Sequence, residues 1–315
     1  MRNLIKRVLG FDNVLVVAHI DPDPDTLGSA LGLKKIFEKL GKTAYVVCDT
    51  EVNARVCGYF GVSPELDNGV VFEPEYIISV DAAAPSQIGA YSERQIDLVI
   101  DHHYTNTLFG KENYVDASAA ATGEIIYELA VGLGVEIDPG FADYIYLAIA
   151  CDSGSFRYSS TTPKTMRMAA ELMEAGCDFA RLNRLVFQSK TKEQIAMERL
   201  AYNSLKFFAG GRIAVITITD EAKKAAGLEG VEIEGINEIA KTVEGVEVGA
   251  VIKEIKEMGG GEFKISLRSN EYVDVAQIAK QYGGGGHMRA AGCKVAGCTA
   301  DELERELVEV LTEAL

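Results

Sequence analysis

The first part of the chain alternates short apolar runs with longer amphipathic stretches. Four runs rich in β-branched residues predict buried strands: NVLVVA (13–18), TAYVVC (43–48), YIISV (76–80) and DLVI (97–100). The stretch from Thr26 to Gly41 has apolar residues at helical spacing and a glycine where a helix would end. Two further stretches, 122–134 and 140–151, also predict helices, and the second is apolar almost all round. This alternation is typical of a parallel sheet with helices on both faces.

A charged helical stretch begins at residue 189 and gives way to a second α/β pattern. It predicts a linker helix over 189–209, which separates a first domain, 1–188, from a second domain, 210–315. The second domain has three strand patterns, RIAVITITD, EVGAVIKEIK and EFKISLRSN, and further helical ones. The sequence therefore predicts an α/β protein with an N-terminal parallel-sheet domain, a linker helix and a smaller C-terminal α/β domain.

Composition narrows the class of protein. The 315 residues are 48% hydrophobic and 25% charged, which is the range of ordinary soluble globular proteins. The N-terminus lacks the pattern of a signal peptide, and the longest apolar run, YIYLAIAC, is far shorter than the roughly 20 residues of a membrane-spanning helix. Six cysteines without a CxxC pair favour unpaired thiols in a reducing compartment. We therefore expect a cytoplasmic protein without a membrane partner.

The formal net charge of −16 restricts the partners of the chain. Binding to long nucleic acid by counterion release requires a basic face, so this charge argues against a protein that binds a long duplex. A short nucleotide remains a candidate ligand, because metal ions and one or two arginines can match its few phosphates.

All four histidines fall in predicted loops beside acids or glycines. His19 follows the first strand, the pair 102–103 follows the fourth, and His287 follows four glycines. Five aspartates occupy comparable positions: Asp23, Asp25, Asp81, Asp101 and Asp152. The first four lie at the carboxyl ends of predicted parallel strands, where ligands bind in open α/β sheets. Asp152 ends the buried helix and would supply a second wall of that crevice.

Several carboxylates that converge at one place require positive charge, because an uncompensated cluster would have to bind protons. Two divalent cations would cancel four carboxylates, and neutral imidazoles would add ligands without charge. Oxygen ligands together with imidazole suit Mn²⁺ or Mg²⁺ better than a metal that thiolates select. The alternative is that the acids are independent turn residues and helix caps, and Asp25 beside Thr26 is the best candidate for a cap.

The turn HIDPDPD, residues 19–25, is the most acidic of these places. Its two prolines are expected to hold the loop extended. Alternation along an extended loop would turn Asp23 and Asp25 to similar sides, so that one loop could serve two ions. Asp21 shares this phase but has no assigned role.

Five separated motifs resemble those of one known family. HIDPDPDTLGS, VDAAAPSQIG, DHH and CDSGSFRYSSTTPKT resemble, in this order, the four motifs of the DHH phosphoesterases. YGGGGHMRAAG resembles the glycine-rich signature of the DHH-associated C-terminal domain. The match extends from residue 15 to residue 293, and within this RecJ-like superfamily the chain resembles the nanoRNase/pAp phosphatase subgroup.

The resemblance implies roles for individual residues of the first domain. Six metal ligands are implied, two for one ion, two for a second and two shared: His19 and Asp23, Asp25 and His102, Asp81 and Asp152. His103 would face the substrate phosphate as a catalytic group, and Asp101 would orient the adjacent histidines.

In the second domain the resemblance implies five substrate-binding residues: Arg268, Gly284, Gly285, Gly286 and His287. The glycines would let the backbone approach a nucleotide closely. The planar guanidinium of Arg268 suits bidentate phosphate binding, and a solvent-facing strand residue is the alternative at this position.

The activity that the resemblance implies is two-metal hydrolysis of a phosphoester, in which a water activated by the ions attacks phosphorus in line. Mn²⁺ is the expected ion, with Mg²⁺ or Co²⁺ as alternatives. The expected substrates are short RNA or DNA oligonucleotides or a nucleoside bisphosphate, 3′-phosphoadenosine 5′-phosphate (pAp). Cyclic or linear dinucleotides, pyrophosphate, and a metal-dependent nucleotide sensor without turnover are the competing hypotheses. The preferred substrate, the polarity of cleavage, the metal used in the cell and a homodimer are left open.

Overall fold

The computed structural model describes residues 1–231, 235–255 and 261–315. The chain forms two compact units, Met1–Ser189 and Lys190–Leu315, and each unit has its own sheet and core. Across the described ranges, no helix is long and apolar enough to cross a membrane. All six cysteines are free thiols.

The sheet of the first unit is parallel throughout, in the strand order β2-β1-β3-β4-β5. Its strands are β1 (Val14–Val17), β2 (Ala44–Val47), β3 (Tyr76–Val80), β4 (Leu98–Asp101) and β5 (Glu112–Val115). The first four confirm the strands that the apolar runs predict. β5, with the sequence ENYV, has only half-buried residues and no apolar run, so its pattern carried no strand signal.

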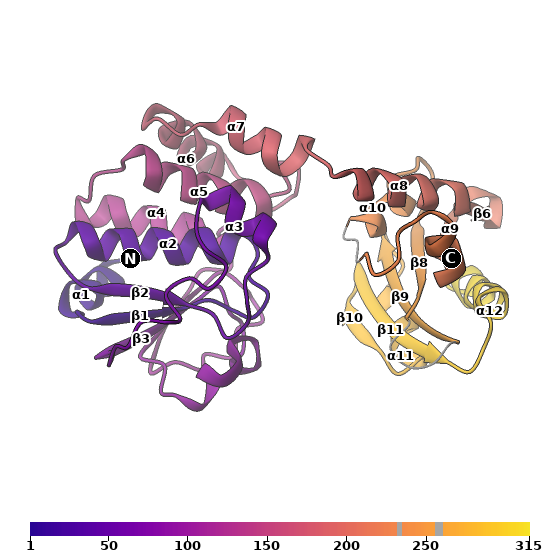
Figure 1. The fold of residues 1–315 in the computed structure, drawn as a ribbon, viewed down its shortest axis with the longest axis horizontal. Helices are drawn as coiled ribbons and strands as arrows, with labels where there is room; N and C mark the ends of the chain where they lie inside the picture. Colours follow the sequence, from indigo (N-terminus) through magenta and orange to yellow (C-terminus); the bar gives the residue numbers. More distant parts are fainter. Residues whose placement is uncertain (232–234, 256–260) are drawn as a thin grey trace. The chain divides into compact units, whose positions relative to one another are not determined.

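Helices cover one face of this sheet (Figure 1). The large core joins one face of the strands to the helices of this unit, among them α1 (Arg2–Gly10), α2 (Pro24–Lys39), α4 (Thr122–Leu133) and α5 (Pro139–Asp152). The unit also contains α3 (Ala54–Phe60), α6 (Pro163–Glu174), α7 (Phe179–Asn183) and the π-helical segment η2 (Arg184–Gln188). The helices expected over 26–41, 122–134 and 140–151 are confirmed as α2, α4 and α5.

Among the described residues, all of Met1–Ser189 included, no α-helix covers the opposite face, so the expectation of helices on both faces is wrong for this unit. Leu15, Ile77 and Val99 of the sheet pack there against Ile88 of the 3₁₀ segment η1 (Pro85–Glu93). This segment lies in the β3–β4 crossover. Its glycine at position 89 has φ = 55°, which interrupts a regular helix.

The second unit has a six-stranded mixed sheet in the order β10-β11-β9-β8-β7-β6. Its strands are β6 (Lys206–Phe208), β7 (Ile213–Ile218), β8 (Val248–Glu254), β9 (Glu262–Ser269), β10 (Gly285–His287) and β11 (Ala290–Ala296). β7 and β8 pair in parallel, and the other neighbours are antiparallel. The three strands expected in this region are confirmed as β7, β8 and β9.

Helices pack on both faces of the second sheet. One core lies between the sheet and α8 (Lys192–Ser204) and α10 (Ile236–Lys241), and the other lies between the sheet and α11 (Val275–Gln281) and α12 (Ala300–Glu313). The short helix α9 (Asp220–Ala225) and the 3₁₀ turn η3 (Ala209–Gly211) complete the elements of the described residues.

The charged helix that the sequence predicted is shorter than expected. It ends at Ser204, and Lys206–Phe208 pairs with β7 as a strand. Met197 and Ala201 bury one side of α8 in a core of the second sheet, so this helix belongs to the second compact unit. The linker role of residues 189–209 stays a prediction.

Candidate functional site

The candidate residues of the first unit lie where three strands end. His19 follows β1, Asp81 follows β3, and Asp101 ends β4 directly before His102 and His103. The strand order reverses between β1 and β3, and ligands bind at such a reversal in open α/β sheets. The fold therefore brings segments from three parts of the chain to one edge.

Helix α2 begins inside the acidic turn, at Pro24, and so earlier in the chain than the sequence predicted. Asp23 is the N-cap of α2 and accepts a hydrogen bond from the Thr26 amide at 3.0 Å, while Pro24 takes the first helical position. Asp25 already lies in the first helical turn. The expectation of an extended loop is therefore wrong, and so is the alternative in which Asp25 is the cap. The helix start, and not strand alternation, places the two acids.

Asp25 is a buried carboxylate held by the start of a second helix. Its side chain accepts hydrogen bonds from the amides of Thr122 (2.8 Å) and Gly123 (2.9 Å) at the N-terminus of α4, and from the hydroxyl of Ser29 (3.1 Å). A Cβ at position 123 would lie 2.6 Å from Ala148 Cβ on α5, so glycine permits this approach. Free amides at a helix start favour negative charge.

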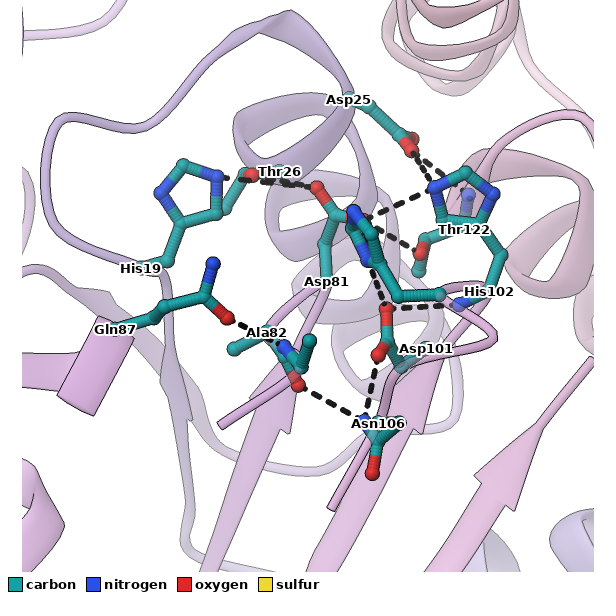
Figure 2. A network of polar contacts seen from close by, with 12 residues as sticks. His19, Asp25, Thr26, Asp81, Ala82, Gln87, Asp101, His102, Asn106 and Thr122 are labelled. Carbon is teal, nitrogen blue, oxygen red and sulfur yellow. Dashed lines mark hydrogen bonds and ion pairs between the residues drawn. The ribbon is translucent and has the colours of Figure 1, made fainter. Parts of the chain in front are cut away.

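Asp81 lies at the centre of the polar network (Figure 2). Its Oδ2 accepts a hydrogen bond from the Thr26 hydroxyl at 2.6 Å, and its Oδ1 accepts one from the Thr122 hydroxyl at 2.8 Å. The backbone of Asp81 has φ = 57°, in the left-handed region that side chains rarely adopt. Such strain is typical of functional sites, where the surrounding contacts stabilise it.

The hydrogen bonds of two histidines fix their tautomers. Nδ1 of His19 lies 2.7 Å from the Ile20 carbonyl oxygen, and Nδ1 of His102 lies 3.2 Å from the Ala119 carbonyl oxygen. A carbonyl oxygen only accepts, so Nδ1 carries the proton in each ring. In the neutral imidazole, Nε2 is then left with a lone pair, which is the arrangement of a metal-binding histidine.

These Nε2 atoms face carboxylate oxygens. Nε2 of His102 lies 3.4 Å from Oδ2 of Asp152, 3.7 Å from Oδ1 of Asp81 and 3.9 Å from Oδ2 of Asp25. Nε2 of His19 lies 4.0 Å from Oδ2 of Asp81. Electron pairs of nitrogen and oxygen therefore converge on the same space, and this donor set fits cations.

Three overlapping groups of side chains in the described ranges have ligand atoms within 4.8 Å of one another: His19, Asp23 and Asp81; Asp25, His102 and Asp152; and Asp81, His102 and His103. The structure thus brings together all six residues for which the resemblance implied metal binding. Asp81 and His102 each belong to two groups, whereas Asp152, for which the resemblance implied a shared position, belongs to one. Asp152 is the last residue of α5, and its side chain is 36% exposed.

Burial and like charge dominate the electrostatics of these acids. Burial, followed by the neighbouring carboxylates, raises the pKa of Asp25, and burial together with Asp23 raises the pKa of Asp81 to about 6. Burial also raises the pKa of Asp152. Within the described part of the chain, the ion-pair partners of these three acids are histidines and not lysine or arginine.

Asp101 and His103 form a second, more regular pair. Nδ1 of His103 lies 2.7 Å from Oδ1 of the fully buried Asp101, whose Oδ2 accepts a hydrogen bond from Asn106 Nδ2 at 2.6 Å. This hydrogen bond from the ring raises the pKa of His103 to about 9, although burial opposes the rise. Burial tends to raise the pKa of Asp101, but the bonds from His103 and Asn106 hold it below its usual value. The His103 side chain remains 41% exposed.

Asp21 lies outside these groups. It is exposed, has φ = 52°, and its amide donates a hydrogen bond to the Thr50 hydroxyl at 3.0 Å. The structure therefore gives this acid a place in the turn that is separate from the carboxylate cluster.

Sequence reasoning missed the neutral partners Thr26, Thr122 and Asn106. Thr122 and Asp81 are 41 positions apart, and no local pattern joins them. The sequence contained one signal for Thr122, the run of small residues SAAATGE, residues 118–124. Small residues at the start of a helix, here α4, are typical of a helix start that packs closely against other segments.

The second unit places Arg268 and His287 in one row of its sheet. His287 on β10 and Arg268 on β9 both pair with Ala290 on β11, so their side chains lie on one face. Nε of Arg268 lies 3.6 Å from Oε1 of Glu238, and its guanidinium also donates to the Leu267 carbonyl oxygen at 3.0 Å. Arg268 is thus held along the sheet, and His287 is exposed.

The three glycines before His287 differ in their surroundings. An added Cβ at Gly284 would meet the backbone of Gly292 and Cys293, and one at Gly286, where φ = 144°, would lie 2.5 Å from the Ala290 oxygen. A Cβ at Gly285 would point into open space. Two of the glycines therefore permit the packing of β11, and Gly285 is the one that leaves room for a ligand.

Two family models match the chain. One is described as the DHH family, N-terminal domain, and matches residues 13–149; the other is the DHHA1 domain and matches residues 186–315. The first range contains the opening acidic turn and the DHH motif, and the second contains the glycine-rich segment.

The chain is also similar to whole proteins. It is 32% identical to the bifunctional oligoribonuclease and PAP phosphatase NrnA of Thermus thermophilus, over 96% of this chain and 90% of the relative. It is 25% identical to the protein of the same name from Bacillus subtilis, over 98% and 97% of the two chains. An exopolyphosphatase-related protein from Bacteroides fragilis has a crystal structure that matches with a TM-score of 0.87 and 22% identity, over 99% of this chain and 96% of that one. At this identity the last match concerns the fold alone.

Proposed function

The chain belongs to the DHH family, and on this premise we propose that it is a hydrolase of phosphoester bonds in short oligoribonucleotides and in pAp, dependent on two divalent cations. The relatives from Thermus thermophilus and Bacillus subtilis are named for these two activities. The similarity to the first extends over nearly the whole of both chains, which supports carrying the substrates over together with the family.

The metal dependence is supported mainly by the short distances between the unprotonated Nε2 atoms of two histidines and the carboxylate oxygens of the aspartates. Nε2 of His102 faces three aspartates, and among the described residues no lysine or arginine forms an ion pair with them. We assign His19, Asp23 and Asp81 to one cation, and a second group to the other: Asp25, His102 and Asp152. Mixed carboxylate and imidazole ligands support Mn²⁺, with Mg²⁺ or Co²⁺ as weaker candidates.

When bound, the cations would supply a reactive hydroxide at neutral pH and positive charge next to the phosphoryl oxygens. The chain itself contributes orientation. The hydroxyls of Thr26 and Thr122 fix both oxygens of Asp81 through hydrogen bonds. The hydrogen bond to Asp101 raises the pKa of His103 to about 9, so the ring would be protonated at neutral pH. Both ring nitrogens then carry protons, and Nε2 of the partly exposed ring would donate a hydrogen bond to a phosphoryl oxygen.

We assign nucleotide binding to the second unit. The guanidinium of Arg268 suits a phosphate, and the open side of Gly285 next to the exposed His287 suits a nucleotide that lies against the backbone. In this proposal residues 1–188 are the catalytic domain, 189–209 the linker and 210–315 the substrate-binding domain. The cytoplasmic location, which the free thiols favour, belongs to the same proposal.

A substrate panel tests the proposed function. Initial rates with Mn²⁺ would be measured for labelled RNA and DNA of two to twenty nucleotides, pAp, cyclic and linear diadenylate, and pyrophosphate. We expect di- and trinucleotides and pAp to be hydrolysed fastest and a chelator to abolish the rates. Equal rates on long strands, or hydrolysis of pyrophosphate alone, would contradict the proposal. Binding of nucleotides without any turnover would instead favour the sensor hypothesis.

A further inference from the structure

The face of the second sheet that carries Arg268 and His287 continues beyond these two residues. Helices α8 and α10 share a core with β7 and β8 on this face. Side chains alternate between faces along a strand, so Ser266 and Lys264 follow Arg268 on the same side of β9. Their partners on β11 are Gly292 and Lys294. Between the row of Arg268 and the row of Lys264, this face of the sheet therefore carries only the small residues Ser266 and Gly292.

Lysines occupy the far end of this face. Lys253, Lys264 and Lys294 pair with one another in a single row across β8, β9 and β11. Lys264 and Lys294 are exposed, and among residues 1–231, 235–255 and 261–315 neither forms an ion pair, although Glu262 is the next residue on the same face of β9. Like charges directly opposite each other destabilise a sheet, and an anion would relieve this repulsion.

A concavity borders the lysine pair. It has a volume of about 490 Å³ and is lined by Lys264, Gly283, Gly284, Gly292, Cys293 and Lys294. This volume is within the range of small-ligand sites. Two groups of basic side chains therefore lie beside the glycine-rich segment. His287 and Arg268 lie near its C-terminal end, and Lys264 and Lys294 lie near its N-terminal end.

The two ends are too far apart for one phosphate. Arg268 and Lys264 are four residues apart on β9, which corresponds to about 13 Å along the strand. We infer that Lys264 and Lys294 form a second anionic subsite, which binds a backbone phosphate of an oligonucleotide of three or more nucleotides beyond the nucleotide at Arg268. This inference rests on the proposed function, because it assumes a nucleotide at Arg268. The subsite would favour short oligonucleotides over pAp.

Protection of a sheet edge is the other explanation for a lysine here. In the part of the chain that the structure describes, β10 pairs with β11 only over residues 290–292, so Lys294 lies on an unpaired edge, where lysines discourage aggregation. Edge protection accounts for Lys294 alone. Lys264 lies between β8 and β11 and has neighbouring strands on both sides.

Binding of two ligands to the full chain tests the inference. A Lys264→Gln/Lys294→Gln variant would be made in an Asp152→Asn background, with Mn²⁺ present, so that hydrolysis is suppressed. The dissociation constants of a labelled pentaribonucleotide and of competing pAp would be measured at several salt concentrations. Lys224→Gln/Lys280→Gln is the matched control, since both lysines are exposed in the same unit but lie on helices α9 and α11.

We expect pentaribonucleotide binding to weaken about tenfold relative to pAp binding, which is the loss of roughly one charge-assisted hydrogen bond. The slope of log K against log salt should fall by about 0.7 for one lost phosphate contact. No change in the ratio of the two constants, or an equal loss in the control, would overturn the inference. Binding does not depend on turnover, so a chain with Asp152 intact that binds the pentaribonucleotide but cleaves nothing with Mn²⁺ would contradict the proposed function and leave the subsite standing.

Discussion

The two units place opposite charges at the sites that we propose for a phosphorylated ligand. In the first unit, buried carboxylates converge on two histidines, and helix starts and threonine hydroxyls hold them in place. In the second, exposed lysines, Arg268 and His287 lie on an open sheet with a glycine-rich strand. The first arrangement is negative and lacks nearby lysine or arginine partners among the described residues, so it requires cations. The second is positive and can meet phosphates directly. Changes in the first should therefore affect metal binding, and changes in the second should affect nucleotide binding.

Loss of one carboxylate in the first unit should have the largest effect. Asp152 has no hydrogen bond from a helix start, so Asp152→Asn removes charge with little disturbance of the fold. We expect hydrolysis of a dinucleotide to fall roughly a thousandfold, because a ligand of a catalytic ion is lost. Steady-state rates over a series of Mn²⁺ concentrations measure the effect. Asp21→Asn is the control, since Asp21 lies in the same chain region as the ligands but outside the cluster. Equal losses in both variants would contradict the assignment of Asp152.

Removal of a neutral partner should have a smaller effect. Thr122→Val keeps the shape of the side chain but removes the hydroxyl that donates to Oδ1 of Asp81. We expect the Mn²⁺ concentration for half-maximal activity to rise about 10- to 100-fold, as for other groups that orient metal ligands. Thr43→Val, at an exposed position, serves as the control. An unchanged Mn²⁺ dependence in Thr122→Val would show that Asp81 does not need this hydroxyl.

Two glycines of the second unit should separate stability from binding. Gly286→Ala places a Cβ against the Ala290 oxygen at a left-handed φ, so we expect a loss of about 1–3 kcal/mol in the free energy of unfolding. Gly285→Ala points into open space, so its stability should remain within about 0.5 kcal/mol of wild type. Chemical denaturation measures both values. The Gly285 variant should nevertheless show a higher KM for pAp, because the methyl group occupies the space left for the nucleotide. A normal KM would remove Gly285 from the ligand site.

The smallest expected effect is that of replacing Asp138, a carboxylate of the first unit that already has lysine partners. Asp138 caps α5 and forms ion pairs with Lys35 and Lys39. Burial tends to raise the pKa of Asp138, but bonds from Lys39, the Phe141 amide and Lys35 hold it well below its usual value. Asparagine caps a helix as well as aspartate does, so Asp138→Asn removes only the ion pairs. It should lower the free energy of unfolding by about 1 kcal/mol at neutral pH without affecting Mn²⁺ binding.

The pH dependence of this effect follows from the lowered pKa. The ionised carboxylate stabilises the fold above the pKa of the unfolded chain, about 3.9, and this contribution is lost as the pH falls toward the folded pKa. The difference between wild type and Asp138→Asn should therefore be full at pH 7 and shrink below about pH 4. Denaturation curves over this pH range measure it. A difference that grows toward acid pH would contradict the assignment of the ion pairs.

The sequence predicted much of the first site because the site depends on strand ends. Apolar runs locate strands well, and the residues that follow parallel strands lie at one edge, so His19, Asp81 and His102 could be placed together from their positions alone. The hypothesis of two cations followed from the number of carboxylates and stays a prediction. The order of the acids within the turn did not, because the choice of Asp23 over Asp25 as the cap depends on where α2 begins.

Contacts between distant segments could not be predicted from local pattern. The amides that bind Asp25 are 97 and 98 positions away from it, and their role depends on how α2, α4 and α5 pack. The 3₁₀ segment η1 that packs on the other face of the first sheet could not be predicted either. It contains Pro85 and Gly89, and its sequence shows no regular helical pattern. In the second unit, β10 and β11 are rich in glycine and alanine, and these residues carry little strand signal.

The most direct test of the account is the number of Mn²⁺ ions bound per chain, because both the proposed hydrolysis and the contrast between the units depend on it. Equilibrium dialysis followed by metal analysis would be carried out on wild type, Asp152→Asn and Lys264→Gln/Lys294→Gln. We expect two ions in the wild type and in the lysine variant, and fewer than two in Asp152→Asn. No bound Mn²⁺ in the wild type, or two ions retained at full affinity in Asp152→Asn, would contradict the account.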